Sequence, residues 1–368
     1  RSGVRLTSAE MDEGWALGCQ AVVKGDAVVI VPEQEQVEVE VTTQAVGAER
    51  IALAAEFTGA LDPSVRRVHI AIEPPSLDDQ TTDWDRLLRE LSLQHGIQKL
   101  SASLPMLRTL GRDLREAEWD VTVVLDMGDS VVNPCDNPRL IDLLPGDQTG
   151  RCYGVSIDIG TTSNVIYLVD LAQGKVIDRA SAYNAQIQAG EDVISRIIFS
   201  QKRDGLRRLQ KMVLKTLNGL LEDLTARNQI PPRQISKAVV AGNTTMIQLF
   251  LAIDPRYLRE MPFIPTVSQP LPVTAEQIGL NIDPQATIDC LPVVGSYVGA
   301  DITAGIIASG MADTDALTLF IDVGTNGELV LGNRDWLIAC ACSAGPAFEG
   351  SGVRHGMRAT AGAIEEIW

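Results

Sequence analysis

One short motif occurs twice in this chain, and it constrains the fold more than any other feature. Residues 158–161 read Asp-Ile-Gly-Thr and residues 322–325 read Asp-Val-Gly-Thr, and an apolar, β-branched run stands on both sides of each copy. An apolar run, a tight turn and a second apolar run are typical of a β-hairpin. The sequence therefore predicts two β-hairpins of the same kind, far apart in the chain.

Each predicted turn has the composition of an anion-binding site. Because these turns lack bulky side chains, consecutive backbone N–H groups can converge on a phosphate. A carboxylate at the end of the first strand, Asp158 or Asp322, can hold Mg²⁺ through water, since Mg²⁺ prefers oxygen ligands and keeps several of its waters. We expect two facing hairpins to grip a polyphosphate through Gly160, Thr161, Thr162, Gly324, Thr325 and Asn326.

The two hairpins resemble the phosphate-binding loops of the acetate kinase, sugar kinase, Hsp70 and actin superfamily. After the first hairpin we expect a strand near 175–183, a long helix at about 191–227, a buried strand at 238–241 and a helix at 246–253. This β-β-β-α-β-α order is the ribonuclease-H-like unit that the superfamily duplicates. The predicted fold class is α/β, with an actin-like ATPase domain of this type.

Further candidate residues lie between that unit and the second hairpin. A Pro-rich insert at 254–292 is expected to precede a helix at 298–309. Asp301 opens this helix, and the superfamily resemblance makes it the candidate base that orients an attacking water; complementing the helix dipole is an equal alternative. Asn243 and Thr244 are good N-cap residues, and the same helix N-terminus could instead face the nucleotide. A P-loop enzyme is excluded because the chain has no G-x-x-x-x-G-K-[ST] motif.

Charge and cysteine usage restrict the partners and the compartment. The net charge of −17 argues against nucleic acid and anionic membrane, which are themselves anionic. No apolar run reaches the roughly 18 residues of a transmembrane helix. Six scattered cysteines without a C-x-x-C pair favour the reduced thiols of a cytoplasmic protein. Cys340 and Cys342 stand two apart in a predicted strand, and we expect both in the core.

The middle of the chain is expected to form a small α/β domain. A rigid break at Pro74 and Pro75 precedes a helix that Ser76 or Asp78 would cap. The aspartates of this stretch are more typical of a solvated face and of helix caps than of a metal site. The chain then divides into four parts, which are residues 1–33, a linker at 34–62, this small middle domain at 63–148, and the ATPase domain at 149–368.

The first part of the chain contains one cysteine with a distinctive surrounding. Cys19 is followed by residues 25–32, which we expect to form a strand that runs into Pro32. This arrangement resembles the C-terminal end of plant-type [2Fe–2S] ferredoxin domains, which implies that Cys19 is the fourth cluster ligand. The other three ligands would come from an upstream C-x4-C-x2-C loop. No such loop precedes Cys19 here, so this interpretation predicts a chain truncated inside that domain; a lone buried cysteine is the alternative.

Three segments, at 73–80, 241–246 and 342–350, together resemble the reductive activators of corrinoid proteins. That family joins a ferredoxin domain, a linker, a middle domain and an actin-like ATPase domain. The order matches this chain, which by this comparison would also lack the C-terminal half of its ATPase domain. The resemblance implies an ATP hydrolase that uses ATP, Mg²⁺ and a [2Fe–2S] cluster to return an inactive Co(II) corrinoid protein to Co(I).

The implied partner is a corrinoid protein, either a corrinoid iron–sulfur protein or the corrinoid subunit of a methyltransferase. A homodimer is compatible with the sequence. Two alternatives stay open. One is a small-molecule kinase of the same superfamily, with an acceptor pocket formed by the insert at 254–292. The other is a scaffold that uses nucleotide only to change shape. Measuring ATP turnover with and without a Co(II) corrinoid protein separates the three hypotheses.

Overall fold

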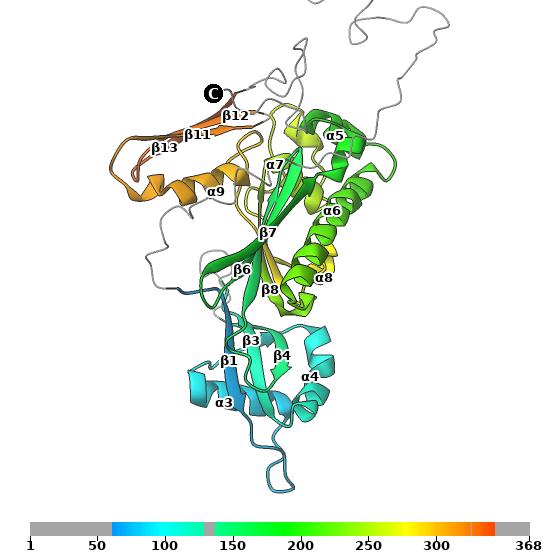
Figure 1. Ribbon diagram of the computed structural model, residues 1–368, viewed down its shortest axis with the longest axis vertical. Helices are drawn as coiled ribbons and strands as arrows, with labels where there is room; N and C mark the ends of the chain where they lie inside the picture. The colour runs from blue at the N-terminus through cyan, green and yellow to red at the C-terminus, as the bar shows by residue number, and fades with distance from the viewer. Residues whose placement is uncertain (1–60, 129–136, 325, 343–368) are drawn as a thin grey trace, which may run out of the picture. The chain divides into compact units, whose positions relative to one another are not determined.

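The residues described by the computed structural model, all within one compact unit, are 61–128, 137–324 and 326–342 (Figure 1). No helix in these ranges is long and apolar enough to cross a bilayer. Several sequence predictions fall outside them, namely those for Cys19, Thr325, the ferredoxin-like end at 1–33, most of the linker at 34–62, and the motif segment 343–350.

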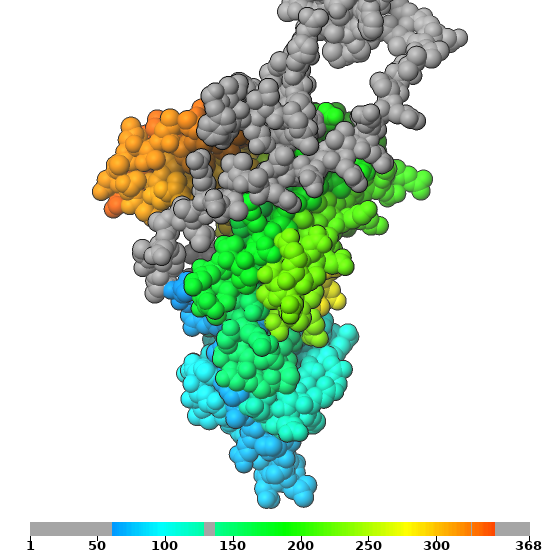
Figure 2. All heavy atoms as spheres, viewed as in Figure 1, coloured from blue at the N-terminus to red at the C-terminus, as the bar shows by residue number. Residues whose placement is uncertain are grey.

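The described part of the small domain contains six elements: β1 (Val65–Ala71), α3 (Asp83–His95), β2 (Ser101–Ala102), α4 (Leu104–Glu116), β3 (Asp120–Asp126) and β4 (Arg139–Pro145). The strands lie in the order β1-β3-β4-β2, with β1 and β4 antiparallel to β3 and β2 parallel to β4. Buried leucines of α3 and α4 pack against this sheet, while the outer sides of both helices lie on the surface (cyan in Figure 2).

The loop before α3 is held by a buried arginine. Arg86 has no exposed surface and donates a hydrogen bond to the Asp79 carboxylate at 2.8 Å. Asp79 is therefore an ion-pair partner of Arg86 while 36% of its side chain stays exposed. The N-cap of α3 is Thr82, so the predicted cap at Ser76 or Asp78 is wrong. The Ser76 hydroxyl instead accepts the backbone N–H of Asp79 inside the loop.

The large domain is built on a six-stranded sheet: β5 (Tyr153–Ile159), β6 (Ser163–Asp170), β7 (Lys175–Tyr183), β8 (Ile235–Gly242), β9 (Val273–Thr274) and β10 (Thr287–Cys290). The spatial order is β7-β6-β5-β8-β10-β9. β7, β6 and β5 are antiparallel neighbours, β5, β8 and β10 run parallel, and β9 is antiparallel to β10. Three antiparallel strands that continue into parallel ones make the ribonuclease-H-like sheet, which confirms the predicted fold class.

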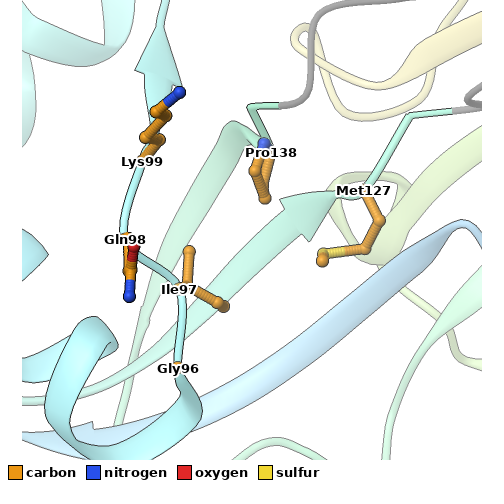
Figure 3. Close-up of a pocket in the computed structure, with 6 residues that line it drawn as sticks. All are labelled: Gly96, Ile97, Gln98, Lys99, Met127 and Pro138. Atoms are coloured by element: carbon orange, nitrogen blue, oxygen red, sulfur yellow. The ribbon is translucent and has the colours of Figure 1, made fainter.

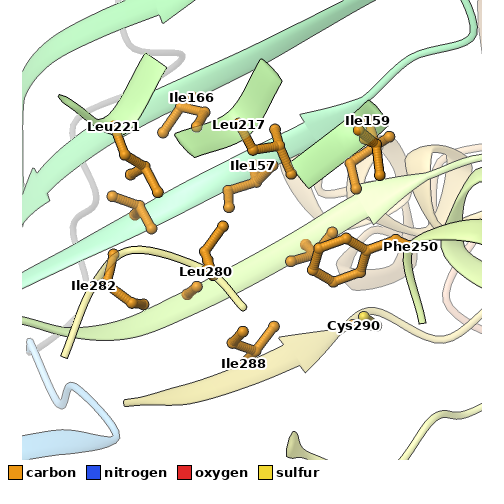
Figure 4. Close-up of a cluster of buried hydrophobic side chains, with 14 of the residues drawn as sticks. Ile157, Ile159, Ile166, Leu217, Leu221, Phe250, Leu280, Ile282, Ile288 and Cys290 are labelled. Atoms are coloured by element: carbon orange, nitrogen blue, oxygen red, sulfur yellow. The ribbon is translucent and has the colours of Figure 1, made fainter. Parts of the chain in front are cut away.

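One hydrophobic cluster fills the space between this sheet and α6 (Gly205–Asn228). Ile157 and Ile159 of β5 point into the cluster, where they meet Leu217 of α6 (Figure 4). Because side chains alternate along a strand, Asp158 points to the opposite face of the sheet. Burial of Ile157 and Ile159 on one face of the sheet therefore fixes the direction of the Asp158 side chain on the other face.

Two helices replace the single long helix predicted at 191–227. They are α5 (Val193–Ser200) and α6, and between them the chain turns at Asp204, whose φ of 58° is left-handed. The apolar spacing continues through both helices, so the pattern did not reveal the turn. The following helix α7 (Thr244–Phe250) is fully buried and starts at the end of β8.

The segment predicted as a Pro-rich insert, 254–292, is part of the sheet. It contains η4 (Arg256–Leu258), β9, α8 (Ala275–Ile278) and β10, and β10 extends the parallel part of the sheet beside β8. Strands of two and four residues among prolines are too short to give a periodic signal. The remaining short helices are η2 (Ala185–Ala189), η3 (Pro232–Gln234) and η5 (Met311–Asp313).

The second hairpin belongs to a three-stranded antiparallel sheet that follows α9 (Ala300–Ser309): β11 (Thr318–Val323), β12 (Gly327–Gly332) and β13 (Leu337–Cys342). Ile302 of α9 packs against Phe320 and Val330 on one face of this sheet. Cys340 and Cys342 are exposed, so the prediction that they lie in the core is wrong for the described residues. Their strand packs its alternate residue, Ala339, toward α9.

Candidate functional site

The β5–β6 turn has its carbonyl groups bound and two of its N–H groups free. The carbonyl oxygen of Gly160 accepts a hydrogen bond from Asn184 Nδ2 at 2.9 Å, and that of Thr162 accepts the Asn184 backbone N–H at 2.8 Å. The carbonyl oxygen of Thr161 accepts Arg196 Nη2 at 2.5 Å. The Gly160 N–H donates to the Ser163 carbonyl oxygen at 3.0 Å, so the prediction that it binds phosphate is wrong, whereas the backbone N–H groups of Thr161 and Thr162 have no hydrogen-bond partner among the described residues. Such a turn presents donors to an anion.

The N-terminus of α7 lies against the same turn. Asn243 is the N-cap: its Oδ1 accepts the Met246 N–H at 3.0 Å, while its Nδ2 donates to Thr161 Oγ1 at 2.9 Å. The capping role that the sequence allowed for Asn243 is therefore confirmed, and its Nδ2 also contacts the β5–β6 turn. The alternative that this helix N-terminus faces a nucleotide stays a prediction. The neighbouring Thr244 is buried, and its hydroxyl donates to the Gly295 carbonyl oxygen.

Close backbone approaches bring β5, β8 and α9 together. Gly242 has a φ of 150°, and a Cβ added there would lie 2.6 Å from the carbonyl oxygen of Ile159. A Cβ on Gly299, the N-cap of α9, would lie 2.5 Å from Asn243 Cα and 2.7 Å from Asp301 Oδ1. Any side chain at either glycine would push these segments apart. The two glycines therefore place Asp301 beside the ends of β5 and β8.

Four carboxylates act on one another at this place. The Asp158 side chain reaches solvent, yet loss of hydration by the surrounding protein and the charges of Asp301 and Asp322 raise its pKa to about 6. Burial, followed by the charge of Asp322, raises the pKa of Asp301. Burial and the charges of Asp301 and Asp322 raise the pKa of Glu328 to about 7. The structure therefore brings together Asp158, Asp301 and Asp322, the three residues that the sequence marked as catalytic candidates.

Glu328 is a member of this group that the sequence pattern did not reveal. Its Cα is the direct partner of Asp322 across β11 and β12. In the first hairpin the partner of Asp158 is Val165. The innermost paired residues of that hairpin enclose a turn of four residues, 160–163, whereas those of the second hairpin enclose a turn of three, 324–326. The two copies of the motif thus differ by one residue in the turn. Counting outward from the Gly-Thr-Asn turn is the signal that identifies Glu328.

The arrangement of these four carboxylates is suited to a cation that is bound through water molecules. Among the described residues, the charges that shift the pKa values of Asp158, Asp301 and Glu328 are all those of other carboxylates. A divalent cation would balance this surplus of negative charge. No set of three or more described His, Cys, Asp or Glu side chains is close enough to ligate a metal directly. Asp158 and Asp322 would therefore contact Mg²⁺ through its hydration shell.

A cavity of about 360 Å³ lies elsewhere, in the small domain between the α3–β2 loop and the ends of β3 and β4 (Figure 3). Among the described residues, Lys99 is the only charged residue that lines it, and no described carboxylate, thiol or imidazole stands beside the Lys99 amine to form a catalytic pair with it. The lining residues are Gly96, Ile97, Gln98, Lys99, Met127 and Pro138.

The strand order and the two hairpins define a domain of the actin, Hsp70 and sugar kinase class. Three family models match consecutive parts of the chain: the RACo linker region at 54–150, the RACo middle region at 153–314, and the C-terminal domain of RACo, the ASKHA domain, at 316–368. The linker-region model spans the small domain described above. The chain belongs to this family, the reductive activators of corrinoid proteins.

Similar proteins carry names of the same kind. A solved structure of a reductive activator for a corrinoid, iron–sulfur protein is 44% identical, with a TM-score of 0.72 over 83% of this chain and 47% of that one. The corrinoid activation enzyme RamQ of Eubacterium limosum is 36% identical over 62% of this chain and 39% of its own length. A [Co(II) methylated amine-specific corrinoid protein] reductase of Methanosarcina barkeri is 24% identical over 58% of this chain and 40% of its own. The chain spans less than half the length of each of these relatives.

Proposed function

We propose that the protein carries out the ATP-dependent reductive activation of a corrinoid protein, in which an inactive Co(II) centre returns to Co(I). One electron would come from a [2Fe–2S] cluster that Cys19 helps to hold, and ATP hydrolysis would drive the cycle. The partner would be a corrinoid iron–sulfur protein or the corrinoid subunit of a methyltransferase. Family membership supports the class of reaction, and the names of the relatives support the class of partner.

The observation that carries the ATP part of the proposal is the β5–β6 turn. Its carbonyl groups are bound behind the turn, and the N–H groups of Thr161 and Thr162 are free. Free N–H groups that are already oriented can stabilise the charge on a transferring phosphoryl group without reorganising during the reaction. The turn of the second hairpin would bind the phosphates from the other side at Asn326, because the Gly324 N–H already donates to the Asn326 carbonyl oxygen at 2.9 Å.

The four carboxylates would divide the remaining tasks. Mg²⁺, when bound, would neutralise charge on the phosphate oxygens, and Asp158 and Asp322 would hold it through water. Asp301 lies in the first turn of α9, and its raised pKa makes it a better proton acceptor than an ordinary aspartate. We assign to Asp301 the task of orienting the attacking water. Its place in the first helical turn also complements the helix dipole.

ATP hydrolysis can drive an uphill electron transfer only if states of the activator differ in affinity for the Co(II) and Co(I) forms of its partner. The test follows from this requirement. ATP turnover is measured with and without a Co(II) corrinoid protein, while the absorption of the corrinoid reports formation of Co(I). We expect the Co(II) partner to raise ATP turnover and Co(I) to form only with ATP. Formation of Co(I) at the same rate without ATP would contradict the proposal.

The kinase alternative is weakened by the position of residues 254–292. These residues contribute β9, α8 and β10 to the sheet and its edge, and thus serve the fold. A small-molecule kinase would phosphorylate an added sugar or carboxylic acid. When ATP is incubated with the protein and such a compound, we expect each ATP consumed to release one inorganic phosphate. Measuring phosphate release and ATP loss in the same sample tests this expectation.

A further inference from the structure

Arg196, on α5, is buried without a negatively charged partner. It has no exposed surface, and its four hydrogen bonds among the described residues all go to neutral acceptors. These are the carbonyl oxygens of Gly190 and Thr161, Oε1 of Gln186 and Sδ of Met246. The other fully buried arginine in the described part of the chain, Arg86, is paired with the Asp79 carboxylate at 2.8 Å.

A buried charge without a partner is costly, so a fold retains it only where something balances it. Burial lowers the pKa of Arg196 to about 10, which leaves the guanidinium charged at neutral pH. The one nearby charge that acts on it, Asp192, is engaged as the N-cap of α5 by the N–H and hydroxyl of Ser195. The remaining positive charge lies directly behind the β5–β6 turn.

The contact with the turn gives this charge a direction. Arg196 Nη2 donates to the carbonyl oxygen of Thr161 at 2.5 Å. That carbonyl belongs to the same peptide group as the N–H of Thr162, which has no partner among the described residues. A charged donor on the carbonyl side polarises the peptide and strengthens the N–H as a donor on the other side. The charge of Arg196 therefore reaches an anion in front of the turn through one peptide group.

Arg196 also ties the turn to its surroundings. Its Nε donates to the Gly190 carbonyl oxygen at 2.9 Å, and its Nη1 lies 3.2 Å from Sδ of Met246 in α7. Asn184, which holds the carbonyl groups on both sides of Thr161, is itself fully buried. These hydrogen bonds prevent the carbonyl groups of the turn from rotating toward a bound anion, which the carbonyl oxygens would repel.

We propose that Arg196 is the positioning residue of the first phosphate turn: it fixes the Thr161–Thr162 peptide with its N–H group outward and supplies the buried positive charge that a bound phosphate balances. This inference rests on the proposed function in that the phosphate is taken to be that of ATP. It adds a residue that never touches the nucleotide, and it predicts that anion affinity and adenosine affinity separate when Arg196 is changed.

The experiment compares Arg196→Gln and Arg196→Lys with the wild-type protein by calorimetric titration of ATP, inorganic tripolyphosphate and adenosine, each with Mg²⁺. Gln removes the charge, whereas Lys keeps it but cannot reach all the acceptors of a guanidinium. We expect Arg196→Gln to weaken ATP and tripolyphosphate binding by about 10- to 100-fold, the range for one charged hydrogen bond. Arg196→Lys should fall between, and adenosine affinity should not change.

Arg86→Gln is the matched control, because it removes a fully buried arginine of the small domain whose partner is a carboxylate. It should lower the urea midpoint and leave tripolyphosphate affinity unchanged. Equal losses of adenosine and tripolyphosphate affinity in Arg196→Gln would indicate a merely structural role and overturn the inference, as would unchanged affinity for both. If Arg196→Gln does not fold, Arg196→Lys decides by the same two criteria.

The two proposals fail in different ways. Wild-type protein that binds ATP but never produces Co(I) would refute the proposed function and leave the role of Arg196 intact. Variants of Arg196 that bind tripolyphosphate as the wild type does would refute the role of Arg196 and leave the proposed function intact.

Discussion

Asp322 and Glu328 are direct partners across the β11–β12 hairpin, so two carboxylates face each other at one end of the candidate site. Like charges directly opposite on neighbouring strands destabilise a sheet. Here the cost appears in Glu328, whose pKa burial and the charges of Asp301 and Asp322 raise to about 7. Such an arrangement favours cation binding, because a bound cation relieves the repulsion that destabilises the free protein.

The first prediction concerns Asp322. Asp322→Asn should lower ATP turnover by about 100-fold or more, the scale on which one group that stabilises charge in the transition state acts. Removing one of several repelling carboxylates should not destabilise the fold, so the urea midpoint should stay the same or rise. Steady-state phosphate release and urea unfolding on the same preparation check both parts. Turnover at the wild-type rate would show that Asp322 is not part of the ATP site.

The second prediction concerns Glu328, for which we expect an effect on Mg²⁺ affinity and little effect on maximal turnover. Glu328→Gln keeps the size of the side chain and removes the charge opposite Asp322. We expect a weaker apparent affinity for Mg²⁺, by about 3- to 10-fold, while turnover at saturating Mg²⁺ changes little. Titrating Mg²⁺ in the ATPase assay measures the shift. A fall in turnover that added Mg²⁺ cannot restore would assign Glu328 a direct role in the reaction.

The outcome for these residues shows what the sequence could reveal. The motif around Asp158 predicted a strand, a turn and a carboxylate at the end of the strand, because all three depend on the local pattern of apolar residues. Glu328 was missed because its position depends on a difference of one residue between the two turns. The role proposed for Arg196 was invisible for another reason: an arginine in an amphipathic helix is usually solvated, and this one is buried because η2, the β5–β6 turn and α7 pack around it.

The short elements were lost for a similar reason. β10 has four residues, and nothing in its sequence distinguishes it from a loop. It becomes a strand because β8 offers it a parallel partner from Lys237 to Val240. The strand β10 therefore forms because of its tertiary pairing with β8, whereas the central strands could be predicted from the pattern of their own apolar residues.

A third prediction concerns Cys19, which lies outside the described residues. Cys19→Ser should remove or distort the absorption of the [2Fe–2S] cluster and stop electron delivery, because the thiolate is the ligand that iron requires. ATP hydrolysis without partner should continue. Cys340→Ala is the matched control, since Cys340 lies on β13, and it should leave the cluster spectrum unchanged. A normal cluster in the Cys19→Ser protein would make the ferredoxin interpretation wrong.

The last prediction concerns Asp142 of β4 and Asp283, two buried carboxyl groups that interact between the small and the large sheet. Burial and the charge of Asp142 raise the pKa of Asp283, and burial raises that of Asp142. Asp283 Oδ2 has no hydrogen-bond partner among the described residues, and a proton between the two groups would supply one. Arg233, whose Nη2 lies 3.5 Å from Asp142 Oδ1, offsets only part of the repulsion.

The sign of the pH dependence follows from the raised pKa values. Between the unfolded pKa of about 4 and the higher folded value, the folded protein binds more protons than the unfolded chain, so stability falls as pH rises. We expect the wild-type protein to lose on the order of 1–2 kcal/mol from pH 5 to pH 8 through this pair. Asp283→Asn, whose amide can donate to Asp142, should flatten the dependence and raise the urea midpoint at pH 8. Asp335→Asn, at an exposed aspartate, is the control and should keep the wild-type slope. The same slope in Asp283→Asn as in the wild type would show that the pair shares no proton.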